Sequence, residues 1–250
     1  MNSLAPIALP GLANLRDLGG LRTHDGRRTR SGRLLRSATP FFLSAAQAPG
    51  IVNDLGIRLR VDLRSPGEIS GATNAHLAAI EQGVLIAPLR SGGRDAVPDI
   101  PDPAQALTAH YLRFLEHAGD SFAAIARAVA DPGKLPALLH CTLGKDRTGA
   151  VAAVLLSSVG VTDEEIVADY VRTQGQTDEL LEQLRDLPEY ARRLDELPAE
   201  ALSALPCAMT DFLTGLNAMH GGGRGYLSSV GVEDVVLEAL IHALVEGASA

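Results

Sequence analysis

Short apolar runs of strand length alternate with longer amphipathic stretches along this chain. Residues 57–63 alternate apolar and polar side chains, a pattern typical of a half-buried strand. Residues 83–88 and 135–140 are short apolar runs, which also indicate strands. Because helical stretches separate these runs, the pattern predicts an α/β fold with a central, largely parallel sheet flanked by helices.

Residues that typically begin or end a helix bound the helical stretches. Gly160 suits a helix C-terminus, and Thr162 with Glu165 has the spacing of a capping box at the start of the next helix. The predicted helices cover residues 104–130, 148–158, 162–172, 177–218 and 232–246, with the acidic fourth stretch broken into two or three helices at Pro188, Pro198 and Pro206.

The remaining segments complete a protein of one domain. Residues 14–37 are expected to form a β-hairpin that turns at Asp25 and Gly26, and residues 91–103 form a loop rich in Gly, Pro and Asp. Since no flexible linker divides the chain, we expect a single domain over residues 1–250. Within it, residues 177–205 are interpreted as a helical lid or insertion; the alternative is a solvated helical face packed on the core.

Composition narrows the class of protein. The chain has 250 residues with 22 Lys and Arg against 30 Asp and Glu, a net charge of −8, which argues against a nucleic-acid-binding protein. No apolar run approaches the roughly 20 residues of a transmembrane helix, so we expect no stable membrane insertion. The N-terminus lacks the pattern of a signal peptide, and two cysteines cannot form a disulfide framework. These features predict a cytoplasmic protein and leave open export without a signal peptide.

Charge is unevenly spread along the chain. Seven Arg and two Asp lie between Arg16 and Arg36, whereas residues 163–200 hold twelve acidic residues and four Arg. The Arg-rich stretch is interpreted as a solvated hairpin, and the alternative is a surface that attracts polyanionic ligands.

The ten residues from His140 to Gly149, HCTLGKDRTG, are the most informative stretch for chemistry. They join a predicted strand to a predicted helix, so the N–H groups of the loop can converge on an anion beside the helix N-terminus. Gly144 allows a turn that a Cβ would hinder, and the planar fork of Arg147 can bind two phosphate oxygens. Helix N-termini and neighbouring cations favour the thiolate form of cysteine, so Cys141 is expected to be the nucleophile.

The other residues of this stretch are assigned supporting roles. Thr148 is expected to hydrogen-bond the sulfur and to help it leave, while His140 orients the loop through its ring nitrogens. The loop residues expected to bind the phosphate are Thr142, Leu143, Gly144 and Lys145. We predict hydrolysis of phosphate monoesters through a phosphocysteine, with no metal and no cofactor.

Alternative functions remain for such a loop. A nucleotide-binding P-loop would need Gly where Leu139 stands and Ser or Thr where Asp146 stands, and there is no spacing of zinc ligands. A sulfur transferase of the rhodanese type shares a cysteine within an anion-binding loop. A non-catalytic phosphate-binding module would need Arg147 without Cys141.

The motif resembles the signature of the cysteine-dependent protein-tyrosine phosphatase superfamily. The Lys145-Asp146 pair makes it similar to the bacterial tyrosine and lipid phosphatase family typified by the mycobacterial protein-tyrosine phosphatase B. Further segments resemble motifs of that family nearly from end to end; they are residues 14–20 (with Leu15 where Phe is usual), 61–65, 225–227 and 230–232. The resemblance implies substrates among phosphotyrosine proteins, with phosphoserine or phosphothreonine proteins and phosphoinositides as further classes.

The resemblance also points to a general acid. It implies Asp146, with Asp62 at the end of its strand as a second carboxylate, whereas the usual Trp-Pro-Asp loop is absent because the chain has no Trp. An ion pair with an Arg is the alternative role for Asp62. The loop before residue 104 offers other candidate acids, which are Asp95, Asp99 and Asp102.

Three residues outside these acids are also assigned. The resemblance links Lys145 to phosphoinositide turnover, and Arg64 at a strand end is the candidate for a further substrate contact. Cys207 lies among Leu205, Met209 and Phe212, so we expect it to be a buried structural thiol.

Overall fold

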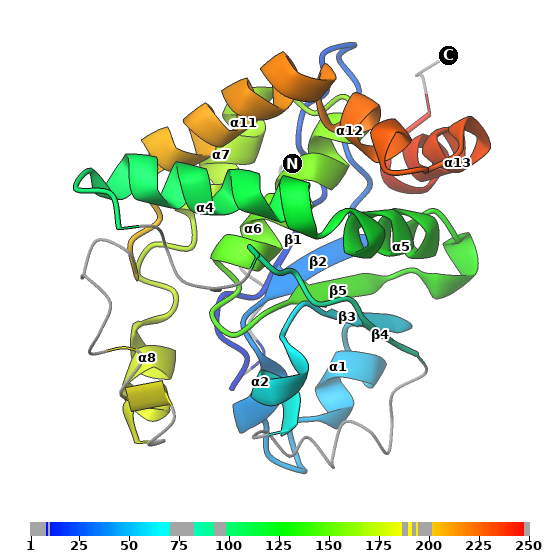
Figure 1. Ribbon diagram of the computed structural model, residues 1–250. Helices are drawn as coiled ribbons and strands as arrows, with labels where there is room; N and C mark the ends of the chain where they lie inside the picture. The colour runs from blue at the N-terminus through cyan, green and yellow to red at the C-terminus, as the bar shows by residue number, and fades with distance from the viewer. Residues whose placement is uncertain are drawn as a thin grey trace.

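A five-stranded sheet forms the centre of the computed structural model, which describes residues 9, 11–70, 83–92, 99–186, 190, 191, 194 and 202–247 (Figure 1). The strand order is β1-β2-β5-β3-β4. Only the β1–β2 pair is antiparallel. The strands are β1 (Arg16–Asp17), β2 (Leu34–Ser37), β3 (Leu59–Asp62), β4 (Val84–Ile86) and β5 (Ala137–His140). The prediction of an α/β fold with a largely parallel sheet is therefore confirmed.

Helices cover both faces of the sheet. In Figure 1, α1 and α2 lie below the sheet, and α4, α5, α6, α7, α11, α12 and α13 lie above it. Their bounds are α1 Pro49–Asn53, α2 Pro66–Ser70, α4 Pro103–His117, α5 Gly119–Val129, α6 Asp146–Ser158, α7 Asp163–Val171, α8 Asp178–Arg185, α11 Pro206–His220, α12 Gly223–Ser229 and α13 Asp234–Leu244, with 3-10 turns at Pro40–Phe42 and Pro132–Lys134. None of these described helices is long and apolar enough to cross a membrane.

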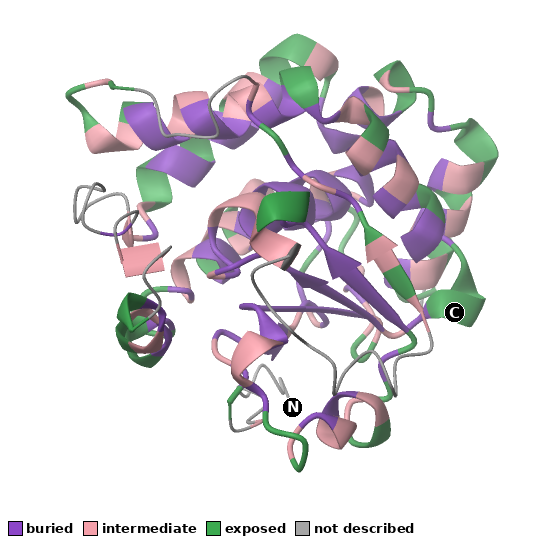
Figure 2. Cartoon of the chain, turned by 60° about the horizontal axis from the view of Figure 1, so that its bottom comes forward, coloured by how far each residue is buried: buried purple, intermediate pink, exposed green. Residues whose placement is uncertain are grey.

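Side chains that alternate along the central strands pack into two separate hydrophobic cores. Leu139 of β5 packs into the main core on the helix-rich side. Leu138 joins a smaller core with Leu35 and Ile51 on the side of α1. Because both faces are covered, the inner strands are buried throughout, as their purple colour shows in Figure 2. The edge strand β4 differs, since Val84 and Ile86 are exposed.

The prediction of a single helix over residues 104–130 was wrong. The chain forms two helices, α4 and α5, separated at Ala118. A Cβ at Gly119 would lie 2.9 Å from a methyl of Val230, so the start of α5 packs closely against the residue that follows α12. Side-chain periodicity continues across such a break, and therefore the pattern did not reveal it.

Two local predictions also need correction. Cys207 is exposed at the start of α11, while Ala208, Met209 and Phe212 take the buried positions of that helix. The helix after Thr162 is present as α7, but the Thr162 side chain makes no capping bond to it. Glu165 instead pairs with Arg22 at 2.6 Å.

Candidate active site

The loop of residues 141–145 joins the central strand β5 to α6 at the carboxyl edge of the parallel strands. Cys141 comes directly after β5 and is 3 % exposed, and Asp146 opens α6. Because β5 lies between β2 and β3, side chains from both neighbouring strands and from the segments after them reach this loop. A helix N-terminus facing a strand end favours binding of an anion there.

Hydrogen bonds from three residues outside the loop fix the orientation of the loop peptides. The Thr39 N–H donates to the Thr142 carbonyl at 2.9 Å. Asn14 Nδ2 donates to the carbonyls of Leu143 and Gly144 at 3.1 Å each, and Arg36 Nη2 donates to that of Gly144 at 2.7 Å. Since the C=O and the following N–H of a trans peptide point in opposite directions, the N–H groups of residues 143–145 face away from these donors.

Gly144 lets the loop pass close to β2. Its φ is +69°, a conformation in the left-handed region, and a Cβ there would lie 2.3 Å from the carbonyl oxygen of Ser37. Both conditions require glycine at this position.

Arg147, in the first turn of α6, is held by a carboxylate that the sequence analysis did not single out. Its Nη1 and Nη2 donate to the two carboxylate oxygens of Glu68 in α2, at 2.7 and 2.8 Å. The Thr142 hydroxyl donates to the same carboxylate at 3.0 Å. Glu68 in turn forms a capping box with Ser65, whose N–H and hydroxyl both donate to it at 2.9 Å. A Ser-x-x-Glu signal at the end of β3 was present in the sequence, but it indicates only a helix start.

Charge in this part of the site is consistent with an anion-binding arginine. Burial alone would raise the pKa of Glu68, but the Arg147 guanidinium lowers it to about 2. Burial alone would lower the pKa of Arg147, but Glu68 and the charge of a Cys141 thiolate raise it above its ordinary value. Arg147 therefore stays charged at neutral pH.

Asp146 lies on the other side of the loop, with its side chain 27 % exposed. Its Oδ1 accepts from the Tyr111 hydroxyl at 2.7 Å and lies 3.2 Å from Lys145 Nζ. Burial alone would raise the pKa of Asp146, but Lys145 and Tyr111 outweigh it and lower the pKa below its ordinary value.

Two other loop-proximal residues are buried. The Lys145 side chain is 1 % exposed, and its Nζ donates to the Ser203 carbonyl at 3.1 Å as well as pairing with Asp146. The Thr148 side chain is fully buried, and its hydroxyl has no hydrogen-bond partner within the described part of the chain.

A buried polar group lies at the base of the loop. Asp62 accepts from Arg64 at 2.8–3.0 Å and from Arg60 at 3.1 Å. Arg60 Nη1 lies 2.8 Å from His140 Nε2; since a guanidinium only donates, this places the imidazole proton on Nδ1, 3.2 Å from the Cys141 carbonyl oxygen. Burial lowers the pKa of His140 to about 3, so the ring is neutral at pH 7.

The structure thus places Asp62 in a buried ion pair. Burial alone would raise its pKa, but the charges of His140 and Arg64 lower it below its ordinary value; because His140 is neutral at pH 7, Arg64 provides this effect there. Arg64 is itself 2 % exposed and committed to Asp62.

The candidate acids before α4 lie apart from these contacts or outside the described residues. Asp102 is the N-cap of α4 and accepts from the Gln105 N–H at 2.9 Å. Asp99 is exposed, and Asp95 lies outside the described residues.

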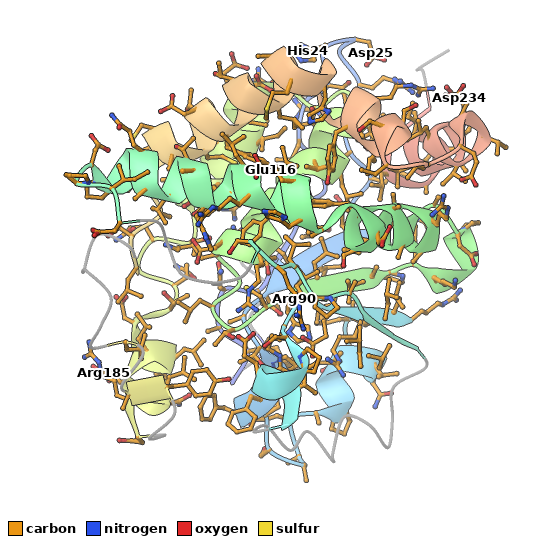
Figure 3. All side chains as sticks on the ribbon, viewed as in Figure 1. His24, Asp25, Arg90, Glu116, Arg185 and Asp234 are labelled. Atoms are coloured by element: carbon orange, nitrogen blue, oxygen red, sulfur yellow. The ribbon has the colours of Figure 1, made fainter. Side chains whose placement is uncertain are left out.

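The Arg-rich segment does not form one polyanion-binding surface. Arg16 and Arg36 are buried and both pair with Asp169 at 2.6 Å. The tip of the hairpin, marked by His24 and Asp25, lies at the top of Figure 3, at the opposite end of the molecule from α2, where Glu68 contacts Arg147.

No group of three or more His, Cys, Asp or Glu side chains among the described residues is arranged to hold a metal ion.

Comparison with known proteins identifies the group to which this chain is related. The chain is 38% identical to a Cupriavidus necator protein provisionally named a tyrosine-protein phosphatase. The alignment of 175 residues covers 67% of this chain and 62% of that protein. It is 28% identical over 199 residues to a tyrosine-protein phosphatase of Nostoc commune, over 74% of this chain and 65% of the relative. The chain thus spans less than two thirds of the length of these curated relatives.

Two further comparisons concern a named enzyme and a solved structure. Identity to the triple specificity protein phosphatase PtpB of Mycobacterium tuberculosis is 30% over 118 residues, which is 42% of each chain. The crystal structure of TpbA from P. aeruginosa aligns with a TM-score of 0.37 and 20% identity, over 83% of this chain and 97% of that one.

The family match extends over nearly the whole chain. The sequence profile of the tyrosine phosphatase family matches residues 7–246, which includes the β5–α6 loop and all the elements that contact it. This chain therefore belongs to the tyrosine phosphatase family.

Proposed function

We propose that this protein hydrolyses phosphate monoesters through a phosphocysteine on Cys141, with tyrosine-phosphorylated proteins as its first substrate class. One observation carries the proposal: a buried cysteine begins a loop whose carbonyls are bonded outward, and a carboxylate-held arginine lies in the first turn of the helix that follows this loop. Family membership supports the same chemistry.

The first step transfers the phosphoryl group to sulfur. The Cys141 thiolate attacks phosphorus, the bond from phosphorus to the ester oxygen breaks, and Asp146 gives its proton to the leaving oxygen. Arg147 and the N–H groups of residues 143–145 bind the three equatorial oxygens as their charge redistributes.

The second step returns the enzyme to its starting state. Asp146, now a carboxylate, takes a proton from water while the water oxygen attacks phosphorus and the phosphorus–sulfur bond breaks. The products are inorganic phosphate and the Cys141 thiolate. Thr148 is placed one residue after Arg147 with a buried, unpartnered hydroxyl, and we assign it to the departing sulfur.

We assign the residues at the base of the loop to holding the loop in position. Asp62 is committed to Arg60 and Arg64, so we assign it a positioning role in place of the catalytic role first considered. His140, bonded to Arg60, orients the Cys141 peptide. Arg64 Nη1 has no hydrogen-bond partner among the described residues. We therefore retain Arg64 as the candidate for a further substrate contact.

Residues 177–205 are proposed as a lid over the loop; of these, residues 187–189, 192, 193 and 195–201 lie outside the described residues. Leu180 and Leu184 of α8 are buried in a cluster with Ala38, against which Leu143 of the loop also packs. In Figures 1 and 3, α8 lies at the left of the molecule, with Arg185 at its outer side. A lid here would restrict access to an oxidisable thiolate.

Phosphoserine or phosphothreonine proteins and phosphoinositides are proposed as additional substrates. The name of the mycobacterial relative states a triple specificity for that protein. Lys145 is the candidate headgroup contact, but its side chain must leave Ser203 and Asp146 to reach a ligand. A panel of phosphopeptides and phosphoinositides tests this breadth.

Turnover of p-nitrophenyl phosphate by wild type and Cys141→Ser tests the reaction itself. We expect turnover by wild type and none by the variant, with covalent phosphate trapped on wild-type protein by rapid acid quenching. A binding module would show no turnover in either form, and a sulfur transferase would instead act on thiosulfate.

A further inference from the structure

A chain of two buried tyrosines ends on the proposed general acid. Tyr111 of α4 is fully buried, and its hydroxyl lies 2.7 Å from Asp146 Oδ1 and 2.7 Å from the Tyr170 hydroxyl of α7. A hydroxyl has one proton to donate, and an ionised carboxylate only accepts. Tyr111 therefore donates to Asp146, and Tyr170 donates to Tyr111.

The two oxygens of Asp146 have different surroundings. Oδ1 accepts from Tyr111 and pairs with Lys145. Among the described residues no donor contacts Oδ2, and the side chain keeps 27 % of its surface exposed. The proton of the acid form is therefore carried on Oδ2, because Oδ1 already receives a hydroxyl proton and lies beside an ammonium group.

We propose that Tyr111 is the positioning residue of the general acid: its hydroxyl, aligned by Tyr170, occupies Oδ1 of Asp146 and keeps the transferable proton on Oδ2. This inference rests on the proposed role of Asp146. Tyr111 does not touch the reacting atoms and acts only through the carboxyl group.

Every charged or titratable group around Asp146 bears on its protonation. Lys145 contacts it from the loop, Tyr111 and His110 face it from α4, and Arg147 follows it in α6. Tyr170 faces it from α7 through Tyr111. The Tyr111 bond favours the charged carboxylate, so its loss raises the pKa of Asp146. A bound phosphate dianion acts in the same direction, which populates the acid form in the substrate complex.

The test is the pH dependence of kcat for phenyl phosphate, because kcat reports ionisations in the substrate complex and the poor leaving group of this substrate needs the acid. Tyr111→Phe is expected to move the alkaline limb upward by on the order of one pH unit and to lower the maximum several-fold. Tyr170→Phe moves it less, in the same direction. Tyr226→Phe is the matched control, because Tyr226 is also buried and, among the described residues, its hydroxyl bonds to the Leu115 carbonyl at 3.0 Å and not to Asp146.

The outcomes separate this inference from the proposed function. If Asp146→Asn removes the alkaline limb but Tyr111→Phe leaves it in place, the acid stands and the role of Tyr111 is overturned. An equal displacement in Tyr226→Phe also overturns it, since any lost buried hydroxyl would then suffice. If Asp146→Asn retains the limb, Asp146 is not the acid, and the inference fails with that assignment while the Cys141 chemistry is unaffected.

Discussion

Arg147 presents two edges to its surroundings, and Glu68 occupies one of them. Nη1 and Nη2 bind the carboxylate at 2.7 and 2.8 Å. Within the part of the chain that the structure describes, Nε has no hydrogen-bond partner. The edge formed by Nε and the neighbouring Nη carries only a long contact among the described residues, from Nη2 to the Thr142 hydroxyl at 3.4 Å, and two oxygens of a phosphate can replace it. Glu68 fixes the plane of the guanidinium before a substrate arrives, which avoids the entropy cost of ordering it later.

Glu68→Gln tests this pre-orientation. A glutamine has one acceptor oxygen and no charge, so it cannot hold both Nη groups. We expect kcat/KM for p-nitrophenyl phosphate to fall about 100-fold, since small misplacements of a charge-stabilising group cost that much. Glu233→Gln is the control, because it removes an exposed pairing with Arg127 and leaves the rate unchanged. Wild-type kinetics in Glu68→Gln would show that Arg147 needs no partner.

The residues of the site differ in how far the sequence could predict them. The loop from His140 to Thr148 is contiguous, so its nucleophile, arginine and glycine could be picked from local chemistry. Glu68 acts through a contact with Arg147, 79 residues away, and its local signal indicates only a helix start. Tyr111 could not be predicted either, because its position in the apolar pattern of α4 is that of an ordinary core residue and its partner Asp146 is far away in the sequence. The ion pairs of Asp62 with Arg60 and Arg64 could not be predicted, because they depend on side-chain positions in the folded chain.

At the scale of an element, α8 is attached to the rest of the molecule by a narrow apolar face. Leu180 and Leu184 are buried, while the neighbouring positions 179, 182, 185 and 186 are exposed. The contact reaches Leu143 in the β5–α6 loop through the shared cluster. If α8 belongs to the proposed lid, weakening this face opens that lid without altering the loop itself.

Leu184→Ala tests the attachment of α8. Truncating a buried leucine typically costs about 2–5 kcal/mol, here at the expense of the closed lid. We expect iodoacetamide to alkylate Cys141 several-fold faster than in wild type. Glu182→Ala, an exposed change on the same helix, should alkylate at the wild-type rate. If both variants match wild type, α8 does not control access to the thiol.

Secondary structure was predictable where side-chain periodicity and end signals agreed. The parallel strands and α6 were found because apolar runs and Gly160 agree with their observed limits. The break at Ala118 and the short helix α12 were missed, since tertiary packing against Val230 and Ser157 fixes them. The capping box at Thr162 failed because Glu165 reaches a partner in the hairpin instead.

At the scale of the whole molecule, one carboxylate links four distant parts of the chain. Asp169 of α7 pairs with Arg16 of β1 and Arg36 of β2, and Arg36 continues to the Gly144 carbonyl in the loop. All three charged side chains are at most 4 % exposed. Burial and the charge of Arg36 lower the pKa of Arg16 to about 10, so the Arg16 guanidinium stays charged at neutral pH and depends on Asp169.

Asp169→Asn should therefore destabilise the whole protein. Removing one partner of a buried ion pair typically costs about 3–5 kcal/mol, because the remaining charges stay buried without compensation. We expect the Tm at pH 7 to fall by roughly 10 °C. Glu165→Gln on the same helix is the control, since its pairing with Arg22 lies at the surface and such pairs contribute about 0–1 kcal/mol. Equal Tm losses in the two variants would contradict this account.

The pH dependence of that loss separates electrostatics from packing. Burial alone would raise the pKa of Asp169, but Arg36 and Arg16 lower it below its ordinary value of 3.8. A lowered pKa means that the stabilisation is complete above 3.8 and is lost as pH falls toward the pKa of the folded state. The difference in free energy of unfolding between wild type and Asp169→Asn should therefore be constant from pH 7 to pH 5 and shrink below pH 4, as measured by urea unfolding. A difference that persists unchanged in acid would mean that the asparagine disturbs packing and that the charge of Asp169 is not what joins these elements.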